Sequence, residues 1–216
     1  MIMLKTLKNI KLYILVTFLC SAGNAYSNTT NWDFEVSLNG DEIGYHKFTV
    51  IEKEDSKKIY TTARFEVKFL FFTAYTYSHD NVETWSNNCL ETIQAITDDN
   101  GDLLNVDGYK INNGTNIKTK GEEKKYPECI QTFAYWDMSF LKEKQLLNSQ
   151  TGELVEISSE LIGKEQIKSR GKNITADHYR ITGKDLLIDL WYSNTNDWLA
   201  LESITADGHL IKYIQN

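Results

Sequence analysis

The feature that most constrains the fold is an alternation of apolar and polar residues with a period of two. Residues 32–38 read Trp-Asp-Phe-Glu-Val-Ser-Leu, and residues 59–67 repeat the pattern. Such alternation is typical of strands that have one buried face. Runs rich in Asn, Asp and Gly separate these segments at hairpin spacing, at 39–41, 87–88, 98–101, 112–114, 194–196 and 207–208.

This pattern predicts an all-β fold. We expect residues 26–216 to form a single domain, an antiparallel meander curved into a half-barrel or barrel. The chain has one proline, Pro127, so almost nothing interrupts the strand ladders. At most one or two short helices are expected, the best candidate being 140–147. The segment 158–168 fits a helix or a strand.

The N-terminus is typical of an export signal. Three lysines precede an apolar run over residues 12–22, and Gly23-Asn24-Ala25 supplies the small residues of a cleavage site. The run is shorter than the ~20 residues of a membrane span. We therefore predict that residues 1–25 are a signal peptide cleaved before Tyr26, which places the protein in the periplasm or outside the cell. The alternatives are a retained anchor and lipid attachment at Cys20.

Charge excludes several classes of partner. Cleavage after residue 25 would remove three lysines and no acidic residue, taking the formal net charge from −7 to −10. An acidic chain with no basic cluster is a poor match for nucleic acid. No later segment is apolar enough to span a membrane, so no integral membrane protein is expected once the signal is removed.

Two cysteines, Cys89 and Cys129, remain after such cleavage. An even pair in an exported protein indicates a disulfide. The alternative is a pair of separate buried thiols.

Known catalytic signatures are missing from the sequence, which holds no GxSxG, no Gly-rich phosphate loop and no HExxH. His46, His79, His178 and His209 are far apart in the sequence. We therefore predict no metal site and no cofactor.

The most informative cluster is YTYSHDNVETW, residues 75–85. In a strand, side chains of one parity point to one face, which groups Tyr75, Tyr77, His79, Glu83 and Trp85. One interpretation is a ligand-binding wall, in which the aromatic rings stack on a ligand and His79 and Glu83 orient it. The other is an ordinary sheet face with cross-strand pairs.

A second candidate lies in residues 185–213, which read as three meander strands. Asp189 lies between Leu187 and Trp191 on one strand face, where a carboxylate is poorly solvated and needs a partner. We hypothesise that Asp189 and Trp191 share the face of the first cluster and that His79 pairs with Asp189. The alternative is a purely structural Asp189. The apolar run 69–72 is interpreted as a buried crossing in preference to an exposed loop.

Several short motifs, each present once, together span most of the chain. They are residues 40–46, Tyr77, His79, Glu83, Trp85, 98–101, 136–137, 146–148, 151–152, Tyr179, Gly183, Asp189, 191–192 and 207–208. Their combination resembles the DUF6134 family of exported bacterial proteins of unknown function, which looks related to the DUF3108 proteins. The resemblance implies an envelope location and a β-rich fold. It implies no reaction, cofactor or catalytic residue.

The leading functional hypothesis is a non-catalytic module that binds a hydrophobic or amphipathic ligand, lipid included, on the concave face of the sheet. The lipid is suggested by analogy with curved sheets that resemble the lipoprotein-carrier fold. One alternative is a hydrolase or isomerase that uses His79, Glu83 and Asp189. The other is an envelope interaction protein without a small ligand.

Overall fold

The structure is a computed structural model that describes residues 27–69, 72–205 and 207–215. The predicted signal peptide and its cleavage site before Tyr26 lie outside the described residues. The described strands are β1 (Ser27–Leu38), β2 (Asp41–Lys53), β3 (Ser56–Phe69), β4 (Phe72–Ser86), β5 (Cys89–Asp99), β6 (Asp102–Ile111), β7 (Gly114–Thr119), β8 (Glu122–Tyr126), β9 (Gln145–Leu147), β10 (Leu154–Ser169), β11 (Lys172–Gly183), β12 (Leu186–Tyr192), β13 (Trp198–Ile204) and β14 (Leu210–Gln215).

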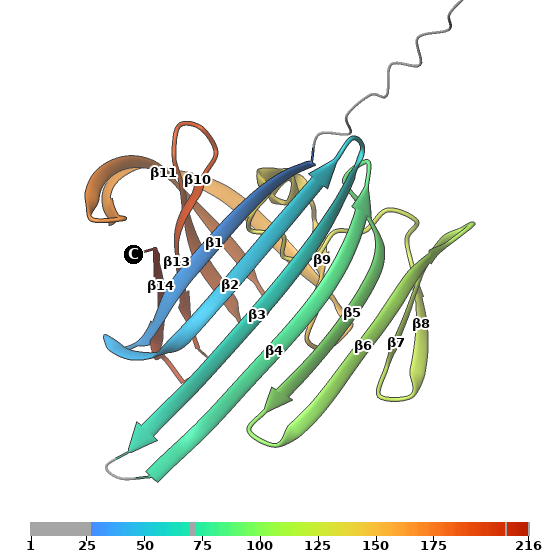
Figure 1. Cartoon of the computed structure of the whole chain (residues 1–216), viewed down its shortest axis with the longest axis horizontal. Coiled ribbons are helices and arrows are strands. Elements are labelled where there is room, and N and C mark those ends of the chain that lie inside the picture. The colour runs from blue at the N-terminus through green and yellow to red at the C-terminus, as the bar shows by residue number, and fades with distance from the viewer. Residues whose placement is uncertain (1–26, 70–71, 206, 216) are drawn as a thin grey trace, which may run out of the picture.

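The strands form one antiparallel sheet of 14 strands, which confirms the predicted all-β meander. Its order is β8-β7-β6-β5-β4-β3-β2-β1-β14-β13-β12-β11-β10-β9. Apart from β8 and β9, strands that follow each other in sequence are paired, and β1 also pairs with β14, which joins the two halves of the meander. The end strands β8 and β9 do not pair with each other, so the sheet curves without closing (Figure 1).

Hairpin turns carry the backbone conformations that their sequences predict. Asn39 and Gly40 have φ angles of 53° and 95°, and Asn100 and Gly101 have φ angles of 53° and 97°. Two successive residues with positive φ make the tight turn whose twist matches paired strands, and Asn-Gly adopts it with little strain.

The concave side of the sheet is filled largely by the chain itself. Residues 127–150, here called the inner segment, run between the two halves of the meander. Tyr135 contacts Trp198 of β13 with the rings tilted and their centroids 5.2 Å apart, while Trp136 meets Trp85 of β4 edge-on at 5.5 Å. The hydroxyl of Tyr192 donates to the Tyr135 carbonyl at 2.8 Å. Aromatic side chains of one segment therefore complete the core of both halves.

A disulfide joins the start of the inner segment to β5. Cys89 and Cys129 are bonded, as the sequence predicted. Beside them the Leu90 amide donates to the Ile130 carbonyl at 3.0 Å. The bridge and this hydrogen bond fix where the inner segment enters the concave side.

Only the first part of the short helix predicted at 140–147 is helical. A single 3₁₀ turn, η1 (Met138–Lys142), begins after Asp137, whose carboxylate accepts from the Ser139 amide at 3.0 Å. The chain then becomes extended as β9, which pairs with β10. Pairing with a neighbouring strand outweighs the weak helical preference of this stretch. Residues 158–168 lie in β10.

The interpretation of residues 69–72 as a buried crossing is also incorrect where the structure tests it. The run spans the end of the β3–β4 hairpin, and residues 70–71 lie outside the described part of the chain. Phe72 is 60% exposed. A hairpin end that extends beyond the sheet has no second layer to cover it (Figure 1).

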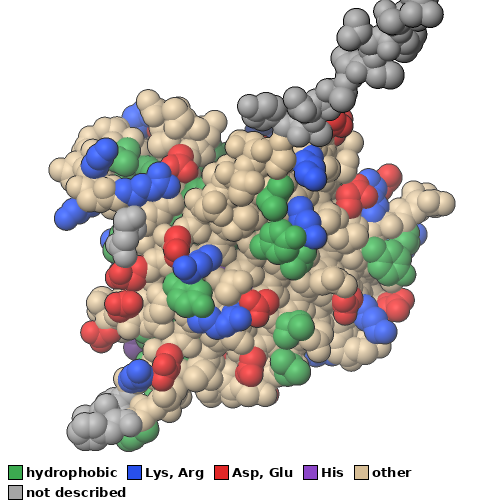
Figure 2. Space-filling view, in the orientation of Figure 1, with side chains coloured by type: hydrophobic (Ala, Val, Ile, Leu, Met, Phe, Trp, Pro, Cys, Tyr) green, Lys and Arg blue, Asp and Glu red, His purple; other side chains and the backbone are tan. Residues whose placement is uncertain are grey.

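Seen from the side of β2–β6, the outer surface mixes charges of both signs. Figure 2 shows Lys and Arg side chains interspersed with Asp and Glu, with hydrophobic side chains in separate small groups. Scattered apolar side chains of this kind are normal for a protein surface. Within the described residues, no helix is long and apolar enough to cross a membrane.

Candidate functional site

The predicted stripe on β4 faces the concave side. Burial alternates along the strand from His79 to Trp85: every second side chain, including those of His79, Glu83 and Trp85, is buried and the intervening ones are more exposed. Tyr77 has the same parity and stacks on Phe65 of β3 at 5.2 Å between ring centroids. Tyr75, two residues before Tyr77, donates its hydroxyl to Asp99 at 2.7 Å. The sequence therefore grouped these five β4 residues on the correct face.

Asn81 belongs to the same stripe but was not singled out from the sequence. It lies between His79 and Glu83 in the period-two pattern and is 5% exposed. The same parity rule identifies it, but a single amide carries no signal of a particular chemistry. Asn81 nevertheless donates to Glu83, one of the two ionisable side chains of the stripe.

Glu83 is the centre of a buried hydrogen-bond network. Its Oε1 accepts from Asn81 Nδ2 at 2.8 Å. Its Oε2 accepts from Trp85 Nε1 at 2.7 Å and from Thr132 Oγ1, on the inner segment, at 3.2 Å. Burial raises the pKa of Glu83, and these three hydrogen bonds oppose the rise. The network ties the inner segment to the sheet through a single carboxyl group.

Two histidines lie on the concave face near this network. His79 Nδ1 is 2.8 Å from Thr97 Oγ1, and burial lowers the pKa of His79 to about 4. His46 Nδ1 is 3.2 Å from the hydroxyl of Tyr213, and burial, followed by the nearby His79, lowers the pKa of His46 to about 3. Both imidazoles are therefore uncharged at neutral pH. His46 lies two residues before Phe48 and four before Val50, so the three side chains share one face of β2. The sequence therefore indicates the face of His46 but not its role.

These side chains surround a cavity of about 250 Å³ between the sheet and the inner segment, here called the inner cavity. Two buried atoms among its lining residues, His46 Nε2 and Asn81 Oδ1, have no hydrogen-bond partner. None of the described residues that line it is a lysine or an arginine. The lining consists of His46, Phe48, Thr61, His79, Asn81, Glu83, Thr132, Phe133, Tyr135, Trp136, Asn148, Ser149, Gln150, Leu186 and Ile188.

The hypothesis that Asp189 and Trp191 share this face is wrong. Ile188 and Leu190 of β12 lie in the main core, and Ile188 lines the inner cavity. Asp189 lies between them in the strand and therefore points to the outer face. Trp191 belongs to a separate small cluster with Ala176 and Leu199. The more apolar face of β12 packs into the core. His79 and Asp189 therefore lie on opposite sides of the sheet.

Asp189 does pair with a histidine, but with His178 of the neighbouring β11. His178 Nε2 is 2.8 Å from Asp189 Oδ1, and His178 Nδ1 is 2.9 Å from Glu165. Arg180 contacts both oxygens of Asp189 at 2.8 and 3.0 Å. Partial burial favours a higher pKa for Asp189, but the hydrogen bonds from Arg180 and His178 bring it below its ordinary value. Trp191 stacks on His178 at 4.6 Å and closes this outer cluster.

Asp189→Asn is expected to lower the free energy of unfolding by about 1–2 kcal/mol, because an amide cannot accept from Arg180 and His178 as a carboxylate does. Urea denaturation at neutral pH measures this loss. The matched control is Asp33→Asn, which breaks an exposed pair with Lys47 and should change stability much less, because solvent screens exposed ion pairs. Equal stability of the two variants would contradict a structural role for Asp189.

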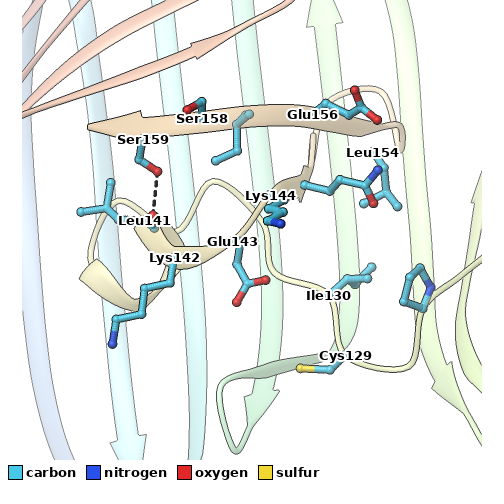
Figure 3. A pocket seen from close by; sticks show the side chains of 13 residues that line it. Cys129, Ile130, Leu141, Lys142, Glu143, Lys144, Leu154, Glu156, Ser158 and Ser159 are labelled. Atoms are coloured by element: carbon cyan, nitrogen blue, oxygen red, sulfur yellow. Dashed lines mark hydrogen bonds between the residues drawn. The ribbon is translucent and has the colours of Figure 1, made fainter. Parts of the chain in front are cut away.

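A second, larger hollow lies where the sheet fails to close. This seam groove, of about 970 Å³, runs between Cys129 and Ile130 on one side and β10 on the other (Figure 3). The hydroxyl of Ser159 donates to the Leu141 carbonyl at 2.6 Å across one end of the groove. The charged side chains at its rim, such as Glu143, are exposed to solvent. The seam groove is a weaker candidate for a ligand site than the inner cavity, because none of its described lining residues holds a buried polar atom that lacks a partner.

Comparison with known proteins agrees with this architecture. The family model described as "Domain of unknown function (DUF6134)" matches residues 34–216. The chain belongs to the DUF6134 family. No curated protein sequence matches it.

Among solved structures, the DUF6134 chain is similar to a β-barrel-like protein of the DUF1849 family from Brucella abortus. The TM-score is 0.62 at 7% sequence identity, and the match covers 86% of this chain and 95% of the other. At this identity the similarity shows a shared fold and carries no information about a ligand.

The inner cavity of the DUF6134 chain is poorly arranged for acid–base or nucleophilic chemistry. Ser149 Oγ lies 3.5 Å from His79 Nε2, but the other ring nitrogen contacts the neutral Thr97, where a catalytic dyad needs a group that stabilises the imidazolium. Both oxygens of Glu83 are already occupied by donors. Within the described residues, no group of three His, Cys, Asp or Glu side chains could hold a metal ion. The arrangement is suited to holding a polar group.

Proposed function

We propose that this protein is a non-catalytic binding protein for a small amphipathic ligand, which it holds in the inner cavity. The observation that carries the proposal is the pair of buried atoms, Asn81 Oδ1 and His46 Nε2, that have no hydrogen-bond partner beside that cavity. An unsatisfied buried polar atom costs about 1–3 kcal/mol. A ligand with matching polar atoms would recover this cost.

The composition of the cavity walls supports an amphipathic ligand. Polar side chains from β3 and β4 lie on the sheet side, while Phe133, Tyr135 and Trp136 line the cavity from the inner segment. Ligand sites in proteins commonly combine aromatic walls with a few polar groups that fix orientation. An interior needed only for packing would be more stable with apolar side chains in place of His79, Asn81 and Glu83.

The size of the inner cavity favours a compact ligand over a whole lipid. Its volume of about 250 Å³ is below the ~300–1,000 Å³ typical of sites for drug-sized ligands. The inner segment occupies the part of the concave side that a long acyl chain would need.

We also propose that the protein is exported and binds its ligand in the cell envelope. The cationic, then apolar, N-terminus supports export. The bond between Cys89 and Cys129 fits an oxidising compartment. Both features come from residues remote from the cavity, so they support the location and not the ligand.

Native mass spectrometry of protein purified from its own host tests the binding proposal. We expect an adduct of a small molecule that is released on denaturation. Ser149→Phe places a ring at a half-buried position of the cavity wall and should abolish the adduct, because the added ring fills the space.

The control places the same substitution in the other hollow. Ser158→Phe adds a ring at an exposed position of the seam groove and should retain the adduct. A wild-type mass without any adduct would count against the proposed function. Loss of the adduct in Ser158→Phe alone would move the site to the seam groove.

A further inference from the structure

The inner cavity differs from an ordinary mixed site in its unpartnered atoms, because one of them can only accept and the described lining residues supply no lysine or arginine. Asn81 Oδ1 is a carbonyl oxygen, which can only accept, and it has no partner. The amide cannot be reversed at no cost, because Asn81 Nδ2 donates to Glu83 at 2.8 Å. A ligand group that satisfies Asn81 must therefore be a donor.

Glu83 carries the acidic group of the cavity. Its three hydrogen bonds come from a side-chain amide, an indole and a hydroxyl, so none of them brings a positive charge. The described lining residues include no lysine or arginine. Burial without a cation makes the charged form of Glu83 costly and raises the pKa of its carboxyl group, while the three hydrogen bonds oppose the rise. A positive charge in the cavity would lower this cost.

The two histidines do not supply that charge. His79 is buried and His46 is half-buried, and desolvation lowers the pKa of both, which favours their neutral forms. His46 Nδ1 faces the hydroxyl of Tyr213, and the tautomer in which Nδ1–H donates to that hydroxyl leaves Nε2 as an acceptor. That tautomer would add a second free acceptor to the cavity lining. An anionic group would find no complementary charge in the cavity.

Aromatic side chains also line the inner cavity. Phe133, Tyr135 and Trp136 of the inner segment are among them. Aromatic faces attract cations, most strongly where water is excluded. The aromatic side chains and the acceptor atoms of the cavity therefore both favour a positively charged ligand group.

The geometry points to a small organic ammonium compound as the ligand, with its charged nitrogen beside Asn81 and Glu83 and its apolar part against the aromatic rings of the inner segment. This inference rests on the proposed function, which requires only an amphipathic ligand, and adds the charge of its polar group. A protonated primary amine has three donors and no acceptor, which matches the acceptors of the cavity.

Three probes with one phenyl ring and different polar groups test the inference: phenethylamine, phenethyl alcohol and 3-phenylpropanoate. Isothermal titration calorimetry at neutral pH should show phenethylamine binding at least about tenfold more tightly than the alcohol, since one partly shielded charge interaction of 1.4 kcal/mol corresponds to that ratio. The carboxylate should show no binding. Ser149→Phe, checked for folding by circular dichroism, should abolish binding of every probe and so locate it in the inner cavity.

Glu83→Gln separates charge from shape. In this variant the affinity for phenethylamine should fall to that of the alcohol, while the affinity for the alcohol is unchanged. The comparison of three probes on the unaltered protein does not depend on whether this variant folds. Tighter binding of the alcohol or the carboxylate than of the amine would overturn the ammonium inference and leave the proposed function standing. No binding of the amine would also overturn it, while the adduct experiment above tests the proposed function separately.

Discussion

Lowering the pH from 7 to 5 is expected to reduce the free energy of unfolding by about 2 kcal/mol for each of His46 and His79. Burial lowers their pKa values to about 3 and about 4, against 6.5 for an exposed histidine. In the unfolded chain both imidazoles take up protons as the pH falls through 6.5, whereas in the folded protein they stay neutral. Proton uptake therefore stabilises the unfolded state. The loss begins near pH 6.5 and ends where the folded pKa values are reached.

Urea denaturation of wild-type protein, His46→Gln and His79→Gln at pH 7 and pH 5 measures this effect. Each variant should lose about 2 kcal/mol less than the wild type between the two pH values, because glutamine does not titrate. The raised pKa of Glu83 acts in the opposite direction, since its folded state favours the protonated carboxyl. This contribution is common to all three proteins and cancels in the comparison if the Glu83 network is intact.

The exposed His209, in the β13–β14 turn, provides the control. His209→Gln shows what replacing an exposed histidine by glutamine does to stability at each pH. If His79→Gln and wild type lose the same stability between pH 7 and pH 5, His79 is not buried in its neutral form. The description of the inner cavity as a site without cationic residues would then be incorrect.

Removal of the bond between Cys89 and Cys129 is expected to cost about 4 kcal/mol of stability on the chain-entropy model. The cysteines are 40 residues apart, so the bridge closes a long loop and restricts the unfolded chain. In the folded protein it fixes the start of the inner segment, whose aromatic side chains complete the core. The double variant Cys89→Ala/Cys129→Ala, compared with wild type by urea denaturation, measures the cost.

Reduction supplies an independent check of the same bond. Dithiothreitol should destabilise the wild type to the level of the double variant and leave the double variant unchanged. Non-reducing peptide mapping should recover Cys89 and Cys129 in one cross-linked species. Alkylation of both cysteines without prior reduction would contradict the bond.

Local sequence was sufficient for the strands and for many of the turns. Period-two alternation determined which side chains of β4 share a face, because neighbouring side chains of a strand must point to opposite sides. The Asn-Gly turns after residues 38 and 99 were readable because few other residue pairs adopt positive φ without strain. The turns at Lys120-Gly121 and Arg170-Gly171 have the same backbone form but begin with a basic residue, which gives no such signal.

The partner of Asp189 could not be determined in this way. Alternation assigns the faces within one strand, but it does not say which face of β12 corresponds to the concave face of β4. These strands are not neighbours, and their relation is set by the whole sheet from β4 through β1 and β14 to β12. His178 lies in the adjacent β11, where cross-strand register brings it opposite Trp191 and next to Asp189.

The sequence by itself determined an antiparallel β-meander, a disulfide and a polar stripe on one face of β4. Only the tertiary structure decided that residues 127–150 fill the concave side and that His46, Asn81 and Glu83 meet there around a cavity. The reason is physical. Strand pattern and turn type depend on interactions between residues close in the chain, whereas the inner segment has no periodic pattern of its own. Its position depends on aromatic contacts with strands more than 40 residues away on either side, such as those of Tyr135 with Trp198 and Trp136 with Trp85.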